Sequence, residues 1–353
     1  MFSRRMIEAL DSIFGEPVPV ISRNDRPEDC PPPFLAERWF QGCGHRSERF
    51  RKFGLIRRCI TADTPSFLST HPHFAPWLRY QQRILKQPFL CVAHGIDVWN
   101  IAGSVVASGL EKAECVLPVS HYTADRLRAQ LGSGTPPLEW FPNTFDEARF
   151  RPGPMTHDWR KHLGIPQDVP LLLSVGRVAK TESGKGYDMV LDRMPDLVKR
   201  HPGITWVLGG TGDDLDRIAR KAASLGVADR CRFPGFIEDE QLVDLYRAAD
   251  LFVLPSRKEG FGIVFLEAAA CGLPVIAGNR DGSVDALADG KLGMLIDPGS
   301  AEQLMKAIDT TISRPKPDAE TLHAECVRRF GKHAFQERLQ SILQSYPRLL
   351  GRR

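Results

Sequence analysis

The stretch Ser256-Arg257-Lys258-Glu259-Gly260-Phe261-Gly262-Ile263-Val264-Phe265-Leu266-Glu267 decides the fold, because it predicts a strand end, a glycine-bearing turn and a helix. The preceding run, residues 250–255, is short and apolar, as strands buried in a parallel sheet are. Gly260 and Gly262 let the backbone approach a ligand closely, and the following helix presents unpaired N–H groups and its positive dipole end. The stretch therefore predicts a phosphate-binding turn.

Two glutamates belong to this predicted turn and helix. We expect Glu259 in the loop at the mouth of the site and Glu267 on the helix, below its first turn. A carboxylate can accept hydrogen bonds from two hydroxyls of a sugar or a ribose, so this pair beside a phosphate cradle describes a nucleotide-sugar pocket. The alternative is that one glutamate caps the helix start and the other reaches solvent.

The order of these motifs resembles that of a known family. Glu259 followed by Gly-Phe-Gly, with seven residues before Glu267, is similar to the signature of the retaining nucleotide-sugar glycosyltransferases of family 4, which have the GT-B fold. The similarity continues through Pro274-Val275-Ile276-Ala277 and residues 292–298, and covers most of the second half of the chain. It implies an α/β protein with two Rossmann-like domains facing a central cleft, and a C-terminal helix that crosses back to the first domain.

The resemblance also implies roles for residues of the second half. The apolar strand 171–175 ends in Gly176-Arg177, and Lys185-Gly186 precedes a helix, where the family carries cations that hold the donor diphosphate as it leaves. The implied catalytic residues are Arg177, Lys185, Glu259 and His94. The residues implied to bind the donor are Gly210 in the turn beside the nucleotide, Phe233 in the strand against the base, and Gly260, Phe261, Gly262, Ile263 and Glu267.

Some of these motifs allow other interpretations. Gly209-Gly210-Thr211-Gly212 taken alone could equally begin a dinucleotide-binding unit. Lys180 competes with Lys185 for the diphosphate role, although the glycine after Lys185 favours the latter. Arg177 and Lys185 could also be two exposed cations in a loop.

The first half carries fewer matching segments. His94-Gly95-Ile96-Asp97 follows an apolar strand and resembles the family's His-Gly-x-Asp segment, whose histidine faces the donor sugar; ligands bind at the carboxyl ends of such strands. We interpret Asp97 as an N-cap at a helix start before any role in a site. Residues 4–14 predict an amphipathic helix where the family opens with a strand and a glycine-rich loop. We therefore expect an upstream start or a trimmed first domain.

A basic stretch lies between these two segments. Its apolar and cationic residues alternate, which fits a face that meets anionic lipid or a diphosphate-linked acceptor; the alternative is a solvated surface. The cations are Arg46, Arg49, Arg51, Lys52, Arg57 and Arg58.

Composition agrees with this organisation. The 353 residues suffice for two domains: an acceptor-side domain over residues 1–150, a linker over 151–168, a nucleotide-sugar domain over 169–330 and a returning helix over 331–353. The formal charge of +4 does not indicate nucleic acid as a partner. The eight cysteines lack paired C-x-x-C spacing, and no apolar run approaches the ~20 residues that span a bilayer, so we expect a cytoplasmic protein, with peripheral contact at the inner membrane face through the basic stretch.

The resemblance implies transfer of a sugar, with retention, from a UDP- or GDP-linked donor to a glycan or lipid-linked acceptor, in polysaccharide or glycolipid biosynthesis. It implies no metal and no cofactor, because Arg177, Lys185 and the helix terminus supply the positive charge. Two alternatives share the fold: a nucleotide-sugar 2-epimerase, and a non-catalytic protein that binds a nucleotide sugar.

Overall fold

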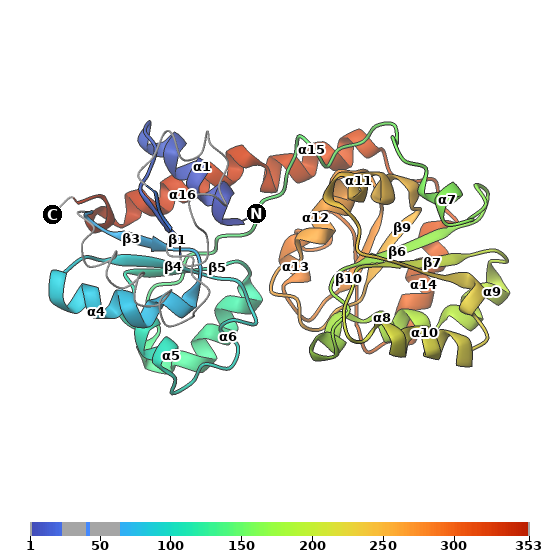
Figure 1. Ribbon diagram of the computed structural model, residues 1–353, viewed down its shortest axis with the longest axis horizontal. Coiled ribbons are helices and arrows are strands. Elements are labelled where there is room, and N and C mark those ends of the chain that lie inside the picture. The colour runs from blue at the N-terminus through green and yellow to red at the C-terminus, as the bar shows by residue number, and fades with distance from the viewer. Residues whose placement is uncertain (1, 23–39, 43–63, 352–353) are drawn as a thin grey trace. The chain divides into compact units, whose positions relative to one another are not determined.

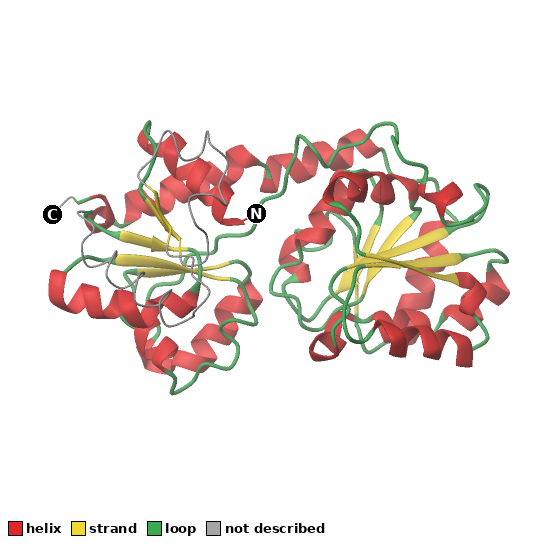
Figure 2. Ribbon diagram, in the orientation of Figure 1, coloured by secondary structure: helices red, strands yellow, loops and turns green. Residues whose placement is uncertain are grey.

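The protein is seen in a computed structural model that describes residues 2–22, 40–42 and 64–351 (Figure 1). Its described elements are helices and parallel strands joined by loops (Figure 2). The chain divides into two compact units, the first made of residues 1–119, 123–141 and 335–353, and the second of residues 120–122 and 142–334. The final helix, α16 (Lys332–Ser345), thus joins the first unit from Phe335 onward, as the predicted return of the C-terminal helix requires.

The second unit is built on a six-stranded parallel sheet with the strand order β11-β10-β9-β6-β7-β8. From the first strand of the unit, β6, the chain adds two strands on one side and then returns to add three on the other. The order therefore reverses between β6 and β9, which defines a topological switch point. The strands are β6 (Leu171–Val175), β7 (Thr205–Gly209), β8 (Cys231–Gly235), β9 (Leu251–Leu254), β10 (Val275–Gly278) and β11 (Met294–Ile296).

Helices cover both faces of this sheet, with α8 and α10 on one side and α11 and α12 on the other (Figure 1). Helix α12 (Ile263–Ala270) is apolar on nearly every side, and it is accordingly buried and packs against α15 (Ala319–Phe330). The remaining helices of the unit are α7 (Trp159–His162), α8 (Tyr187–Leu191), α9 (Met194–Arg200), α10 (Leu215–Ser224), α11 (Asp239–Ala248), α13 (Ser283–Ala286) and α14 (Ala301–Ile312).

The stretch that we expected as a linker, residues 151–168, packs on the second unit. The Asp244 carboxylate accepts hydrogen bonds from the Thr156 hydroxyl, at 2.6 Å, and from the backbone N–H of His157, at 2.8 Å. The buried Arg160 guanidinium donates to the Ala248 carbonyl and forms an ion pair with Asp250 at 2.6 Å. These contacts fix the stretch on the end of α11 and the start of β9.

The first unit contains a three-stranded parallel sheet, β3 (Phe67–Ser69), β4 (Phe89–Ala93) and β5 (Cys115–Pro118), and a parallel pair, β1 (Val20–Ser22) and β2 (Phe40–Gly42). The expected amphipathic helix is α1 (Phe2–Phe14), and α4 (Ala75–Leu85), α5 (Val105–Leu110) and most of α6 (His121–Leu131) belong to the same unit. The predicted lipid-facing stretch from Arg46 to Arg58 lies outside the described residues.

Aromatic packing fixes the end of the chain within the first unit. The ring of Phe335 on α16 lies 4.5 Å from that of Phe141 and 6.0 Å from that of Phe2, measured between centroids. Tyr346 donates a hydrogen bond to Glu139 at 2.9 Å. None of the helices within the described ranges is long and apolar enough to cross a bilayer.

Candidate functional site

The candidate site lies in the second unit, at the carboxyl ends of β6 and β9. These neighbouring strands flank the switch point, where ligands bind in open α/β sheets. The loop after β6 carries Arg177 and Lys185, and the loop after β9 carries Glu259. The backbone N–H of Arg257 donates to the Gly184 carbonyl at 2.8 Å, which ties the two loops together.

Charges of opposite sign alternate across these loops. The Lys185 ammonium lies 2.8 Å from the Glu259 carboxylate and 3.8 Å from that of Glu182, and Arg177 forms an ion pair with Glu182. The side chains of Lys185 and both carboxylates are 20 % exposed or less, whereas that of Arg177 is 70 % exposed. The structure therefore brings Lys185 and Glu259 together, and a diphosphate entering here would compete with carboxylates for both cations. No motif in the sequence had indicated Glu182 as a site residue.

A buried carboxylate holds Glu259 in place. Asp281 is 2 % exposed and accepts hydrogen bonds from the Ser256 hydroxyl at 2.6 Å and from the Glu259 backbone N–H at 2.8 Å. It also accepts from the Ser283 N–H at 2.9 Å, in the capping role that precedes α13. Asp281 therefore joins the loop after β9 to the start of α13 and fixes the backbone at Glu259.

Two glycines of the site are required by close packing and by a positive φ. At Gly210, where φ is +132°, a Cβ atom would stand 1.9 Å from the Gly176 carbonyl oxygen. At Gly262, where φ is +90°, it would stand 2.4 Å from the Phe265 ring, directly before α12. Both positions accept only glycine, and Gly210 thus brings the turn after β7 against Gly176 and Arg177.

Glu267 is buried on the second turn of α12, with 6 % of the residue exposed. The Tyr246 hydroxyl donates a hydrogen bond to its Oε2 atom at 3.1 Å. Burial, and next the Glu267 charge, raise the pKa of Tyr246, so this hydroxyl keeps its proton and remains a donor. The expected bond from Glu267 to a ribose stays a prediction.

Tyr187 places an unpartnered hydroxyl beneath the charged loops. The residue is 5 % exposed, and its hydroxyl, buried without a hydrogen bond within the described part of the chain, points at Gly176, where a Cβ atom would stand 2.7 Å away. A Cβ at the same place would lie 3.7 Å from the Lys185 ammonium. Burial, and then the Glu259 charge, raise the pKa of Tyr187, which keeps the hydroxyl protonated.

The other predicted donor-binding residues contribute in different ways. Phe261 is 2 % exposed and packs on Phe330 with a centroid separation of 5.7 Å, so its side chain belongs to the core and only its backbone is available. Gly260 packs against Gly282, and Ile263 is the first residue of α12. Phe233 lies on β8, with its ring 6.3 Å from that of Trp206.

His94 belongs to the first unit and follows β4 directly. Its Nε2 atom lies 2.9 Å from the Thr70 carbonyl oxygen, which can only accept, so this nitrogen donates the hydrogen bond. The Phe2 ring contacts it edge-on at 4.7 Å. The Asp97 carboxylate accepts from the His94 backbone N–H at 3.2 Å, but no helix begins at Asp97, so the expected role as a helix cap is wrong. The role of His94 toward a donor sugar stays a prediction.

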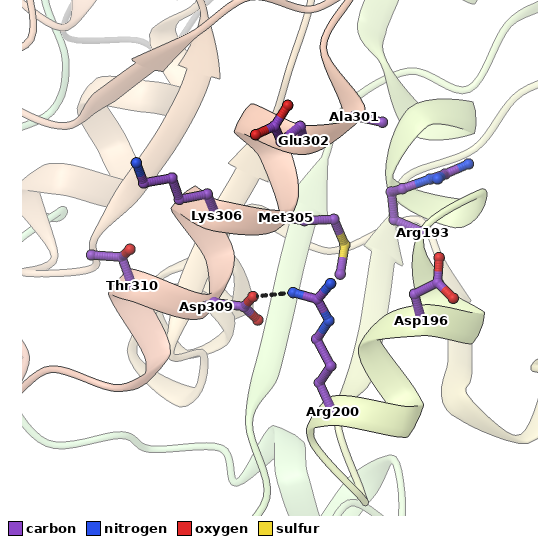
Figure 3. A pocket seen from close by; sticks show the side chains of 9 residues that line it. All are labelled: Arg193, Asp196, Arg200, Ala301, Glu302, Met305, Lys306, Asp309 and Thr310. Atoms are coloured by element: carbon purple, nitrogen blue, oxygen red, sulfur yellow. Dashed lines mark hydrogen bonds and ion pairs between the residues drawn. The ribbon is translucent and has the colours of Figure 1, made fainter.

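Two cavities open on the second unit. One, of about 470 Å³, adjoins the candidate site, because its lining includes Gly184, Gly186 and Lys258 from the two charged loops. The other, of about 430 Å³, lies between α9 and α14, with an ion pair between Arg200 and Asp309 at 2.5 Å inside it (Figure 3). Neither cavity is lined by a predicted site residue. Within the described ranges, no group of three or more His, Cys, Asp or Glu could hold a metal ion.

Comparison with known proteins finds similarity mainly in the second unit. Residues 155–326 match the family model described as glycosyl transferases group 1. A GDP-mannose-dependent alpha-(1-6)-phosphatidylinositol monomannoside mannosyltransferase of Mycolicibacterium smegmatis is 33 % identical over 236 residues, which is 63 % of this chain and 60 % of that protein. D-inositol 3-phosphate glycosyltransferase 2 of Catenulispora acidiphila is 40 % identical over 44 % of this chain and 38 % of its own length. The chain spans about 60 % of the first of these relatives.

Solved structures resemble nearly the whole chain. HepE of Anabaena in complex with UDP-glucose superposes with a TM-score of 0.76 at 18 % identity, over 97 % of this chain and 95 % of that one. Sucrose-phosphate synthase of Thermosynechococcus elongatus gives a TM-score of 0.74 at 24 % identity, over 98 % and 92 %. At these identities the likeness concerns the fold. The similarity to glycosyl transferases group 1 thus lies in residues 155–326, within the second unit, and the fold of the chain is GT-B.

Proposed function

We propose that this chain transfers a sugar, with retention at the anomeric carbon, from a UDP- or GDP-linked donor to a glycan or lipid-linked acceptor. The observation that carries the proposal is the meeting of Lys185 and Glu259 at the switch point of the sheet, with Arg177 on the same loop as Lys185. The cations would bind the donor diphosphate, and Glu259, released from Lys185, would accept hydrogen bonds from sugar hydroxyls.

The chemistry of the proposed step is departure of the nucleoside diphosphate. Negative charge grows on the leaving phosphate oxygen, and the charges of Arg177 and Lys185 would stabilise it without a metal ion. We propose attack on the same face of the sugar, assisted by the leaving phosphate, with Glu267 holding the ribose and His94 the sugar.

The named relatives and solved structures suggest which molecules to try. The mycobacterial relative is named for GDP-mannose and a phosphatidylinositol mannoside, and the HepE structure contains UDP-glucose. We propose a donor of one of these two nucleotide types and a cytoplasmic reaction that builds a cell-surface polysaccharide or a glycolipid.

A panel of donors tests the proposal directly. Thermal unfolding and slow donor hydrolysis would be measured with UDP- and GDP-linked sugars, for the wild type and for Glu267→Gln. We expect one donor to raise Tm and to be hydrolysed, and the variant to lose most of the Tm shift. Glutamine is preferable to alanine, because alanine would leave the buried Tyr246 hydroxyl unpaired.

Two outcomes would contradict the proposal. If no donor raised Tm or turned over, the site would not be a nucleotide-sugar site. If a donor bound and the product had inverted configuration, the result would support sugar transfer but contradict the retaining mechanism.

A further inference from the structure

Helix α4 of the first unit, Ala75–Leu85, exposes an unusual amount of apolar surface. Of the ten large hydrophobic side chains that are exposed within the described residues, four lie on this one helix of 11 residues. Trp77 is 41 % exposed, Tyr80 60 % and Ile84 58 %, and Leu85 adds a further 42 %. Scattered exposed apolar residues are ordinary, but such a concentration marks an interaction surface.

The helix has a buried side that fixes which residues face outward. Ala75, Leu78 and Gln81 are buried at three-residue spacing, and α4 packs against α5. At Gly109 of α5, a Cβ atom would stand 2.5 Å from the Ala75 backbone, so the two helices are in close contact there. With that side occupied, Trp77, Tyr80 and Ile84, at spacings of three and four, form a single stripe on the outer side.

A second stripe beside the apolar one is cationic. Arg79, Arg83 and Lys86 follow at spacings of four and three, all three are exposed, and within the described residues none has an ion pair or a side-chain hydrogen bond. The surrounding sequence contains no acid: from Thr64 to Ile96 there is no Asp or Glu. The partner of this surface should therefore be anionic.

We propose that α4 lies in the plane of an anionic lipid bilayer, with Trp77, Tyr80 and Ile84 inserted at the headgroup boundary and Arg79, Arg83 and Lys86 on the lipid phosphates. Trp and Tyr favour this boundary because one end of each ring system is apolar and the other polar, and arginine and lysine bury their stems while their charges meet phosphate. These six residues are not part of the stretch from Arg46 to Arg58, and their proposed contact with lipid does not depend on the proposed sugar transfer.

The test is co-sedimentation of the full chain with vesicles, without donor or acceptor. We expect binding to vesicles of phosphatidylcholine with 30 mol % phosphatidylglycerol (on the order of a cell's anionic content) and little to phosphatidylcholine alone. Arg79→Glu/Arg83→Glu/Lys86→Glu should weaken binding by ~100-fold or more, since each cation near such a surface contributes about fivefold. Trp77→Ser/Tyr80→Ser/Ile84→Ser should weaken it about tenfold or more.

Matched variants on the second unit distinguish this surface from general effects. Arg220→Glu/Lys291→Glu/Lys306→Glu makes the same change in net charge at exposed positions, and Met155→Ser/Phe236→Ser removes exposed apolar side chains. Both controls should bind as the wild type does. The proposal is overturned if the α4 variants bind vesicles as tightly as the wild type does, or if the control charge variant loses as much binding as the α4 charge variant. It is also overturned if the wild type does not bind anionic vesicles.

Discussion

In the proposed reaction, Lys185 would have two roles, one before and one after the donor binds. Without a donor it pairs with Glu259 at 2.8 Å, and both side chains are largely shielded from water. Breaking such a pair leaves a poorly solvated charge, which is costly unless another charge replaces the partner. A donor diphosphate would be such a replacement, and Glu259 would then be free to bind a sugar. The proposed exchange would explain why this cation and this carboxylate lie in contact.

We expect Lys185→Ala to lower the rate of donor turnover, kcat/KM, by about 100-fold or more, because the variant loses charge stabilisation that grows as the diphosphate leaves. Arg177→Ala should act in the same direction. The control is Lys180→Ala, an exposed lysine in the same loop, which should change turnover by less than about threefold. Equal losses at positions 180 and 185 would contradict the assignment.

Tyr187→Phe should separate stability from binding. An unpaired buried hydroxyl costs about 1–3 kcal/mol, so its removal should raise the Tm of the ligand-free protein by about 2 °C or more. If the hydroxyl acquires its partner only when a donor arrives, the donor-induced rise in Tm should be smaller in the variant. Differential scanning calorimetry with and without donor measures both. A lower Tm for the ligand-free variant would mean that the hydroxyl is already bonded.

At the scale of the elements, the turn after β7 positions the loop after β6. Gly210→Ala places a methyl group 1.9 Å from the Gly176 carbonyl oxygen at a positive φ, so we expect a loss of unfolding free energy above about 2 kcal/mol. Gly226→Ala is the control, since φ is +71° there and no atom lies within 4 Å. It carries only the conformational cost of about 1–2 kcal/mol. Urea denaturation would measure the free energy of unfolding of both variants against the wild type.

Helices α8 and α10 are joined by a charge network that should make stability depend on acidity. Hydrogen bonds from Arg217 lower the pKa of Asp188 to about 2, against about 3.9 in an unfolded chain. A lowered pKa stabilises the fold fully above about pH 4, and this contribution disappears as pH falls through 2. Arg217→Gln should therefore lower Tm at pH 7 and differ little from the wild type near pH 2.

The exposed Arg220 on the same helix supplies the comparison for Arg217. Arg220→Gln should leave the curve of Tm against pH unchanged. A constant Tm difference between Arg217→Gln and the wild type from pH 7 to pH 2 would show that packing, and not the Asp188 charge, accounts for the effect.

The sequence was informative where one local pattern specifies one conformation. Gly262 before an apolar run predicted the turn and α12, and the apolar strands of the second unit, the N-terminal helix and the returning C-terminal helix appeared as expected. Contacts between residues distant in sequence could not be predicted from local patterns. The bonds of Asp281 to Ser256 and Glu259, and the pairing of Glu182 with Arg177, depend on loops that meet only after the sheet assembles. For the same reason Phe261 read as a ligand contact but fills the core.

On the scale of the whole molecule, two phenylalanines five positions apart serve different units. Phe330 ends α15 and packs on Phe261 in the second unit, whereas Phe335 on α16 packs on Phe141 in the first. Each unit thus contains one aromatic ring from the last two α-helices of the chain. Replacing one ring at a time would test whether the two units are stabilised independently.

We expect Phe335→Ala to cost about 3–5 kcal/mol in the first unit and Phe330→Ala a similar amount in the second. Hydrogen exchange followed by mass spectrometry should show faster exchange in β4 and β5 for the former and in β9 and α12 for the latter. Each variant serves as the control for the other. If both accelerated exchange throughout the chain, the two units would unfold as one.

The return of residues 335–353 to the first unit has a consequence for biosynthesis. A ribosome releases residues 142–334 as one uninterrupted run, so the second unit can close its sheet during translation once that run has emerged. The first unit is begun earlier but lacks Phe335 and Tyr346 until the second unit has been synthesised. The first unit, whose synthesis begins earlier, is therefore completed after the second unit. In the interval, the nascent strands β3, β4 and β5 must avoid association with other chains.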